Sequence, residues 1–311
     1  MTESGRALKV LCIDGGGIRG VFAVAILQQI EEEMGMPIGD AFDILAGTST
    51  GAIVAASIAL QRKMGDLLED YKMYGEKIFR RQAKVGIFRT VYSDRYLRRF
   101  FQKAFGHLTL ADINKPLLIP AVDLSHGKPY VHRSNFGMAD QENDLSVKLW
   151  DAVLSSCSAP VYFPPNNIDN KFLSIDGGLW ANNPSLVSIT EAMHHFLAKI
   201  DNIQILSIGT GRQKIDFTNE DEKDWGVKQW LPFQLPSMKV TPKLLDLALH
   251  LSSESVSYHC EQFLGKNYLR VDEDMGEEVP FDDVKYVDRL IELANICATN
   301  RKADVIQFIN T

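Results

Sequence analysis

Cysteine is scarce in this chain, and long apolar runs are absent from it. The four cysteines are Cys12, Cys157, Cys260 and Cys297, and none has the close partner that metal and redox motifs require, so we expect buried free thiols. The N-terminal residues are polar without a signal-like apolar run, and the apolar stretches fall far short of a membrane span. We therefore expect a cytoplasmic protein, whose contact with a membrane would be peripheral at the inner face.

Histidine is present but offers no obvious catalytic base. None of the histidines lies in a glycine-rich or otherwise unusual turn, and we expect each of them to be structural or exposed. The seven are His107, His126, His132, His194, His195, His250 and His259. No internal repeat or low-complexity tract interrupts the chain, and no pattern calls for a metal or an organic cofactor.

The length and composition fit one large enzyme domain, since 311 residues with 45% hydrophobic content can bury a substantial core. Strand-like and helix-like segments alternate, which predicts an α/β sheet with helices on both faces. Strands are predicted at Val10–Ile13, Phe42–Leu45, Leu117–Val122, Tyr130–His132, Phe172–Ile175 and Ile203–Ile208. Helices are predicted at Val21–Glu33, Ala52–Gln61, Leu67–Phe79, Asp94–Phe105, Val147–Ser156, Leu186–Lys199, Pro242–Phe263 and Val284–Phe308. We expect a single domain, with a motif-bearing core at about 8–211 and a helical closing region at about 212–311.

A glycine-rich turn, Asp14-Gly15-Gly16-Gly17-Ile18-Arg19-Gly20, follows the first predicted strand. Its backbone amides and the start of the next helix suit the oxyanion of a tetrahedral intermediate or a phosphate. The glycine spacing also fits a dinucleotide loop, but the second strand ends in Leu45-Ala46-Gly47-Thr48-Ser49 without the acidic residue that binds ribose. A phosphate-binding loop would need Gly-Lys-Ser/Thr, which is missing. A nucleotide-cofactor enzyme is therefore disfavoured.

Two further motifs carry a nucleophile and a base. Gly47-Thr48-Ser49-Thr50-Gly51 lies between a strand and a small apolar helix, as in a nucleophile elbow with Ser49 at its apex. Asp176-Gly177-Gly178 follows a short apolar run, and its glycines allow another loop to approach the carboxylate. A serine hydroxyl needs a base to take its proton. Asp176 fits this role directly, which makes the pair a dyad.

These three motifs, in this order, resemble those of the patatin-like phospholipases, and the similarity runs from about Val10 to about Gly211. The resemblance implies a three-layer α/β/α fold with a mostly parallel sheet. It also implies that Ser49 is the nucleophile, Asp176 the general base and a membrane phospholipid the substrate. Motif residues carried over with them are Gly15, Gly16, Gly17 and Arg19 at the oxyanion hole, Gly47 and Gly51 in the elbow, and Gly177 and Gly178 after the base. No metal or cofactor is implied.

A basic segment and an aromatic loop stand apart from these motifs. Eight basic residues, opposed only by Asp94, are Arg80, Arg81, Lys84, Arg89, Arg95, Arg98, Arg99 and Lys103, in a chain whose net charge is −7. This patch could attract anionic headgroups or a phosphate-rich regulator, and its helix also fits an ordinary amphipathic helix with a solvated face. The Trp225–Leu235 loop fits a surface excursion, a lid, a membrane contact or a subunit interface.

The layout also resembles bacterial patatin-like effectors of anti-phage signalling by cyclic oligonucleotides. That resemblance implies a cyclic-nucleotide activator, bound within this domain or between copies in a homo-oligomer, and no DNA or RNA polymer as partner. A constitutive lipase or esterase would have nearly the same sequence pattern. A peptidase or small-ester hydrolase could use the same dyad, and a non-catalytic regulatory module could have the same fold.

Overall fold

The computed structural model describes residues 6–79, 90–136, 144–212, 233–234, 239–240 and 243–311. Within these residues the main sheet has eight strands in the order β10-β7-β1-β2-β3-β6-β5, with β4 paired to β3. Their bounds are β1 Leu8–Ile13, β2 Ile44–Gly47, β3 Leu117–Asp123, β4 Lys128–Arg133, β5 Asn166–Ile168, β6 Phe172–Asp176, β7 Ile203–Ile208 and β10 Tyr268–Val271. The five strands from β10 to β3 are parallel, and β4, β6 and β5 pair antiparallel.

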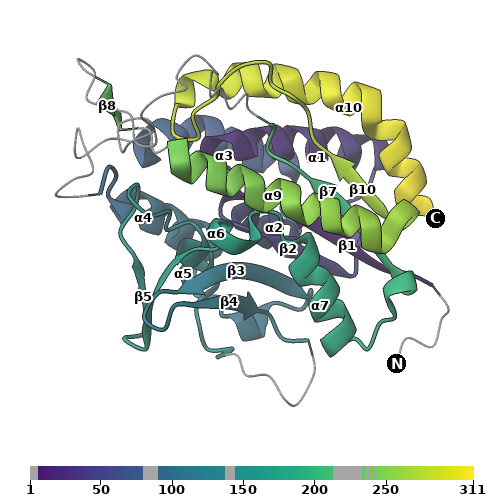
Figure 1. Ribbon diagram of the computed structural model, residues 1–311, viewed down its shortest axis with the longest axis horizontal. Coiled ribbons are helices and arrows are strands. Elements are labelled where there is room, and N and C mark those ends of the chain that lie inside the picture. Colours follow the sequence, from purple (N-terminus) through teal and green to yellow (C-terminus); the bar gives the residue numbers. More distant parts are fainter. Residues whose placement is uncertain (1–5, 80–89, 137–143, 213–232, 235–238, 241–242) are drawn as a thin grey trace, which may run out of the picture.

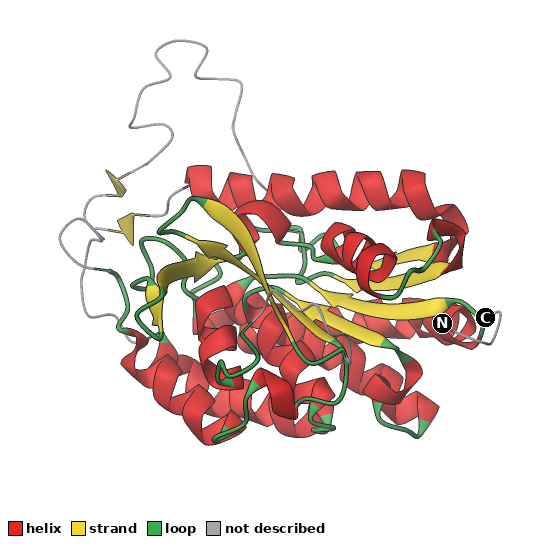
Figure 2. Ribbon diagram, turned by 90° about the horizontal axis from the view of Figure 1, so that it is seen from below, coloured by secondary structure: helices red, strands yellow, loops and turns green. Residues whose placement is uncertain are grey.

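Helices cover both faces of this sheet (Figure 1). The first face carries α1 Gly20–Met34, α2 Thr50–Ala59, α3 Met64–Ile78, α4 Asp94–Phe105, α5 Leu149–Ser156 and α10 Val287–Asn310. The second carries α6 Gly178–Ala181, α7 Ser185–His195 and α9 Lys243–Leu264. Figure 2 shows the sheet edge-on between these two layers. The predicted α/β/α class is confirmed.

Alternation along the central strand β1 explains the two layers. Leu11 and Ile13 pack into the core under the first face, whereas Val10 and Cys12 pack into the core under the second. Successive side chains of a strand point to opposite faces, so a strand that is apolar throughout needs a cover on both. All four residues have no exposed surface.

The remaining described elements are short. Strands β8 Phe233–Gln234 and β9 Lys239–Val240 form a separate antiparallel pair. The 3-10 helices are Gly17–Arg19, Ile38–Ala41, Leu110–Asp112, Ile200–Asn202, Gly265–Asn267 and Val284–Tyr286. The search of the described helices for a stretch long and apolar enough to cross a membrane found none.

The predicted strands and helices agree with the observed ones to within a few residues at most ends. The sequence reasoning missed β5, α6 and, most importantly, β10. Strand β10 lies in the region expected to be helical, yet it pairs with β7 and extends the sheet. It is only four residues long and carries Arg270 in its middle, so it lacks the apolar run by which the other strands were recognised.

Candidate active site

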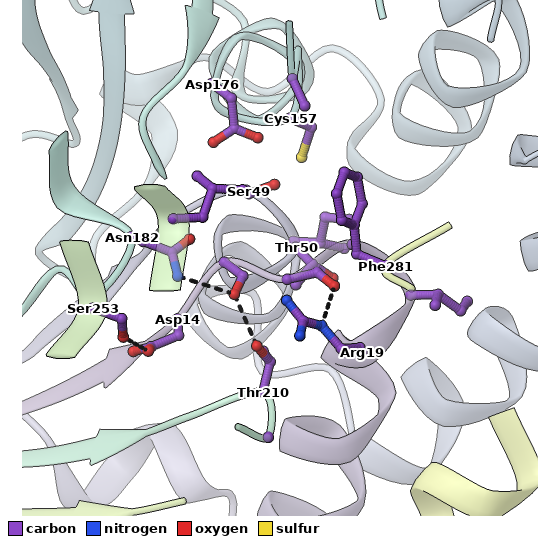
Figure 3. Close-up of a pocket in the computed structure, with 18 of the residues that line it drawn as sticks. Asp14, Arg19, Ser49, Thr50, Cys157, Asp176, Asn182, Thr210, Ser253 and Phe281 are labelled. Carbon is purple, nitrogen blue, oxygen red and sulfur yellow. Dashed lines mark hydrogen bonds between the residues drawn. The ribbon is translucent and has the colours of Figure 1, made fainter. Parts of the chain in front are cut away.

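The pocket that contains the three motifs lies where the parallel strands end. Asp14 follows β1, Ser49 follows β2, Thr210 follows β7 and Asp272 follows β10, and all four line it. Open parallel sheets bind ligands at this carboxyl edge, because the loops there converge. The close-up in Figure 3 shows Ser49 and Asp176 on the same side of this pocket.

Ser49 occupies the strained turn that the elbow motif predicts. Its backbone has φ 55° and ψ −122°, and α2 starts at the next residue. A Cβ at Gly47 would lie 2.0 Å from the carbonyl oxygen of Gly51, and a Cβ at Gly51 would lie 2.2 Å from that of Ile13. Both elbow glycines are therefore needed for close approach of the backbone.

A buried serine supports the turn from behind. The Ser49 N–H donates to Ser156 Oγ at 2.8 Å, and that hydroxyl donates to the Pro120 carbonyl at 2.6 Å. Ser156 has no exposed surface and lies at the end of α5. It ties the backbone of the nucleophile to β3, a contact over 107 residues of sequence that no motif indicated.

Asp176 ends β6 with its side chain buried, at 5% exposure. The Gly178 N–H donates to its carboxylate at 2.7 Å, and the Asp176 N–H donates to the Ser158 carbonyl at 3.1 Å. Burial raises the pKa of Asp176 to about 6, while hydrogen bonding by Gly178 and Ser49 opposes this shift. A carboxylate with this pKa is ionised at neutral pH and is a stronger base than an exposed aspartate.

One backbone amide of the glycine loop that was expected to face the oxyanion is engaged elsewhere. The Gly15 N–H donates to the Asn182 carbonyl at 3.0 Å, so this amide is engaged within the loop. Ile18 N–H likewise donates to the Phe281 carbonyl at 2.8 Å. The amides expected to surround an oxyanion are thereby reduced to those of Gly16 and Gly17. The engagement of Gly15 is a tertiary contact with a residue 167 positions away, which its motif could not reveal.

Packing around the loop leaves no room for larger residues. A Cβ at Gly16 would lie 2.3 Å from Thr210 Oγ1, and Gly17 combines φ +60° with a Cβ position 2.3 Å from the Phe281 carbonyl oxygen. Thr210 also donates to the Gly15 carbonyl at 2.8 Å. The loop is therefore held in one shape by the segment after β7.

Four polar side chains with little exposed surface anchor the start of the loop. Arg270 donates to both carboxylate oxygens of Asp14, at 2.8 and 2.7 Å, and to Asp272 at 2.9 Å. Ser253 of α9 donates to Asp14 as well. Burial opposes the charge on Arg270, but Asp14 and Asp272 hold its pKa well above the usual value. Sequence reasoning missed this network, because Arg270 is 256 residues from Asp14.

Arg19 is buried at the edge of the same pocket, with 9% of its surface exposed. Its Nε donates to the Gly16 carbonyl at 3.4 Å, the bond that the dashed line from Arg19 marks in Figure 3. Burial lowers the pKa of Arg19, and the strongest opposing charge is Asp246 of α9. Asp246 also lines the pocket, and burial raises its pKa to about 6.

The other part of the pocket is apolar. Its lining comes from α2, α3 and α4 and from the loop before β5, with the side chains of Ile53, Ile78, Phe79, Leu97, Phe100 and Phe163. Such a surface accepts a hydrocarbon chain, because burying apolar surface is favourable wherever water is displaced. An apolar region beside a nucleophile suits a fatty acyl substrate.

The residues of the basic patch differ in whether their side chains have partners within the described part of the chain. Arg98 donates to Asp94 and Asn166 and lies 5.4 Å from the Trp150 ring, and Lys103 donates to Tyr74 at 3.2 Å. Arg95 and Arg99 are exposed on α4. Four members of the patch lie outside the described residues, namely Arg80, Arg81, Lys84 and Arg89, as does most of the Trp225–Leu235 loop.

A serine elbow and a buried carboxylate on an α/β sheet define the class of the protein as a serine acyl hydrolase. The family model for patatin-like phospholipases matches residues 11–187. A Pseudomonas aeruginosa protein named cGAMP-activated phospholipase is 30% identical over 95% of this chain and 85% of its own length. Patatin-like protein 4 of Arabidopsis thaliana is 28% identical, covering 90% of this chain and 80% of itself. The chain therefore belongs to the patatin-like phospholipase family, and the predicted resemblance is confirmed.

Proposed function

We propose that this phospholipase releases fatty acids from membrane phospholipids with Ser49 as nucleophile and Asp176 as general base. The observation that carries the proposal is the buried Asp176 carboxylate beside the Ser49 elbow, with a pKa raised to about 6. At neutral pH this carboxylate is ionised and can accept the serine proton. The raised pKa makes it a better match for that proton than an ordinary aspartate.

In the proposed reaction, Ser49 Oγ attacks the ester carbonyl carbon while Asp176 takes the hydroxyl proton. The amides of Gly16 and Gly17 hold the resulting oxyanion, and Asp176 returns the proton to the leaving alcohol of the lysophospholipid. Water then attacks the acyl-serine and gives its own proton to Asp176. When the second tetrahedral intermediate collapses, the fatty acid leaves and Asp176 returns the proton to Ser49 Oγ, which restores the hydroxyl and the ionised carboxylate.

Fatty-acid release from phospholipid vesicles tests these assignments. Ser49→Ala and Asp176→Asn should each lower release by at least about a thousandfold, because loss of either member of a nucleophile-base pair disables acylation. Matched controls are Ser255→Ala and Asp201→Asn, which alter exposed residues. Thermal melting should show all four variants folded. Release by Ser49→Ala at the wild-type rate would overturn the assignment and require a different nucleophile, whereas an unchanged biological effect of that variant would favour a non-catalytic module.

We further propose that a cyclic nucleotide activates the enzyme, with the name of the Pseudomonas aeruginosa relative as support. The exposed Arg95 and Arg99 offer positive charge for such an anion or for the surface of an anionic membrane. Vesicle assays with and without cyclic di- and trinucleotides test this, together with sedimentation to detect a homo-oligomer. Equal release without nucleotide would establish a constitutive lipase instead.

A further inference from the structure

Two charged side chains in the pocket, Arg19 and Asp246, interact electrostatically, but in the described part of the chain they form no direct ion pair with each other. Among the described residues, the one hydrogen bond that the Arg19 side chain donates is the 3.4 Å contact from Nε to the Gly16 carbonyl, so the terminal nitrogens of its guanidinium have no acceptor there. Asp246 Oδ1 is likewise buried without a hydrogen-bond partner. Leaving such groups unpaired is costly, and exceptions in native proteins call for an explanation.

The two groups have complementary chemistry. A guanidinium presents paired N–H donors that match two oxygens of a phosphate, and a carboxylate attracts an ammonium group. Both side chains line the pocket that contains Ser49. A ligand that satisfies both must carry a phosphate and a cation on one short chain.

We propose that Arg19 and Asp246 form a headgroup subsite for zwitterionic glycerophospholipids, with the phosphodiester on Arg19 and the ammonium on Asp246. This inference rests on the proposed phospholipase function and specifies its substrate class. It assigns Arg19 to substrate binding, whereas the family motif places this residue beside the oxyanion hole.

The arrangement of the fold supports this assignment. Arg19 follows Gly17 by two residues, so its side chain starts beside the amides proposed to hold the ester oxyanion. In a glycerophospholipid the phosphate is likewise separated from the ester by only the glycerol unit. Asp246 comes from α9 on the second face of the sheet, whereas the apolar lining comes from α2, α3 and α4 on the first. Headgroup and acyl chain would therefore leave the ester in different directions.

Vesicles that contain equal amounts of phosphatidylethanolamine and phosphatidylglycerol, with identical acyl chains, test the Asp246 contact. Both lipids then share one surface, so the ratio of the two lysolipids reports headgroup selection independently of membrane binding. The wild type should favour the ethanolamine lipid, and Asp246→Asn should reduce that preference about tenfold, as expected for loss of one ionic contact. Glu261→Gln, an exposed change on the same helix, is the control. A product ratio that is the same in wild type and Asp246→Asn overturns the inference.

Two soluble assays test the phosphate contact. Arg19→Met should lose about tenfold more rate on phospholipid than on an uncharged short-chain ester, whereas an equal loss on both would return Arg19 to the oxyanion hole. Glycerophosphoethanolamine should inhibit hydrolysis of the short ester more strongly than inorganic phosphate does. Equal inhibition by the two would show a general anion site and overturn the headgroup assignment. If the wild type hydrolyses both lipids without a headgroup preference, the headgroup assignment is wrong but the proposed phospholipase function stands. If the wild type releases fatty acid from neither lipid, the proposed function itself is wrong.

Discussion

At the scale of single residues, the carboxyl group of Asp176 combines two properties that usually oppose each other. It is nearly inaccessible, which raises its pKa, yet the Gly178 amide holds it in place as an acceptor. The same burial that makes ionisation unfavourable also makes the ionised form a better base. With Asp176 as the proposed base, we therefore expect the surroundings of this side chain to set the pH dependence of the reaction.

The activity should fall as the pH drops through about 6, because only the ionised Asp176 can accept the Ser49 proton. For kcat/KM on a short uncharged ester, we expect a single acidic limb with a slope of about one. Measurement at constant ionic strength between about pH 4.5 and 8 checks this. A midpoint near about 4, the range of an exposed aspartate, would show that the buried environment does not govern the base.

Ser156 should matter to the reaction although it lies behind the nucleophile. Ser156→Ala removes the acceptor of the Ser49 N–H and should lower kcat about tenfold, with a loss of about 1–3 kcal/mol of unfolding free energy. Ser134→Ala is the control, since that hydroxyl is also fully buried and likewise accepts from a backbone N–H, that of Leu117, and donates to a carbonyl, that of Lys115. We expect the control to lose stability but keep kcat. Equal kcat values in the two variants would mean that the turn at Ser49 keeps its shape without the hydrogen bond to Ser156.

At the scale of elements, strand β10 joins the last third of the chain to the glycine loop. Its Arg270 lies between Asp14, at the end of β1, and Asp272, which also accepts from the Gly211 N–H at 2.9 Å. Thr210 in turn bonds the Gly15 carbonyl. The glycine loop is thus held at Asp14 by β10 and at Gly15 by the segment that follows β7.

Replacing Arg270 by methionine should destabilise the fold by about 3–5 kcal/mol, the range found when one partner of a buried ion pair is removed. Asp14 and Asp272 would then face each other without a cation, and the charge of Asp14, whose pKa burial already raises, would cost stability. The loss should therefore be larger at about pH 8 than at about pH 5, where protonation relieves it. Denaturant unfolding at both pH values checks this, with Arg289→Met as the exposed control. A loss that is independent of pH would contradict the ionic role.

How far the sequence predicts these elements depends on the range of the interactions. The turns around Ser49 and Asp176 were predictable, because glycine spacing and flanking strands are local signals. The engagement of the Gly15 amide by Asn182, the Ser156 support and the Arg270 anchor were not, since each is a contact between distant segments. Strand β10 was missed because its four residues form a strand by pairing with β7.

At the scale of the whole molecule, the pocket is built from both layers around the sheet. Helices of the first face provide most of its apolar side chains, together with polar ones such as Tyr71, whereas α9 of the second face provides Asp246 and Ser253 together with Leu249. Both layers meet at the carboxyl ends of the parallel strands, where Ser49 is held. The two layers thus contribute apolar and polar surface in different proportions, and an ester of fatty acid and polar alcohol requires both.

This division also bears on how such enzymes diversify. The segment that matches the family model, 11–187, contains Ser49 and Asp176, the proposed nucleophile and base, whereas α9 and β10 follow it in the chain. On the proposed assignments, we expect substitutions in α9 to alter which lipid is chosen while leaving the reaction itself intact. Arg270 limits this freedom, because the later segment must keep its anchor to Asp14. We therefore expect sequence variation among such enzymes to change lipid selectivity more readily than it changes Arg270, whose two bonds to Asp14 join the later segment to the glycine loop.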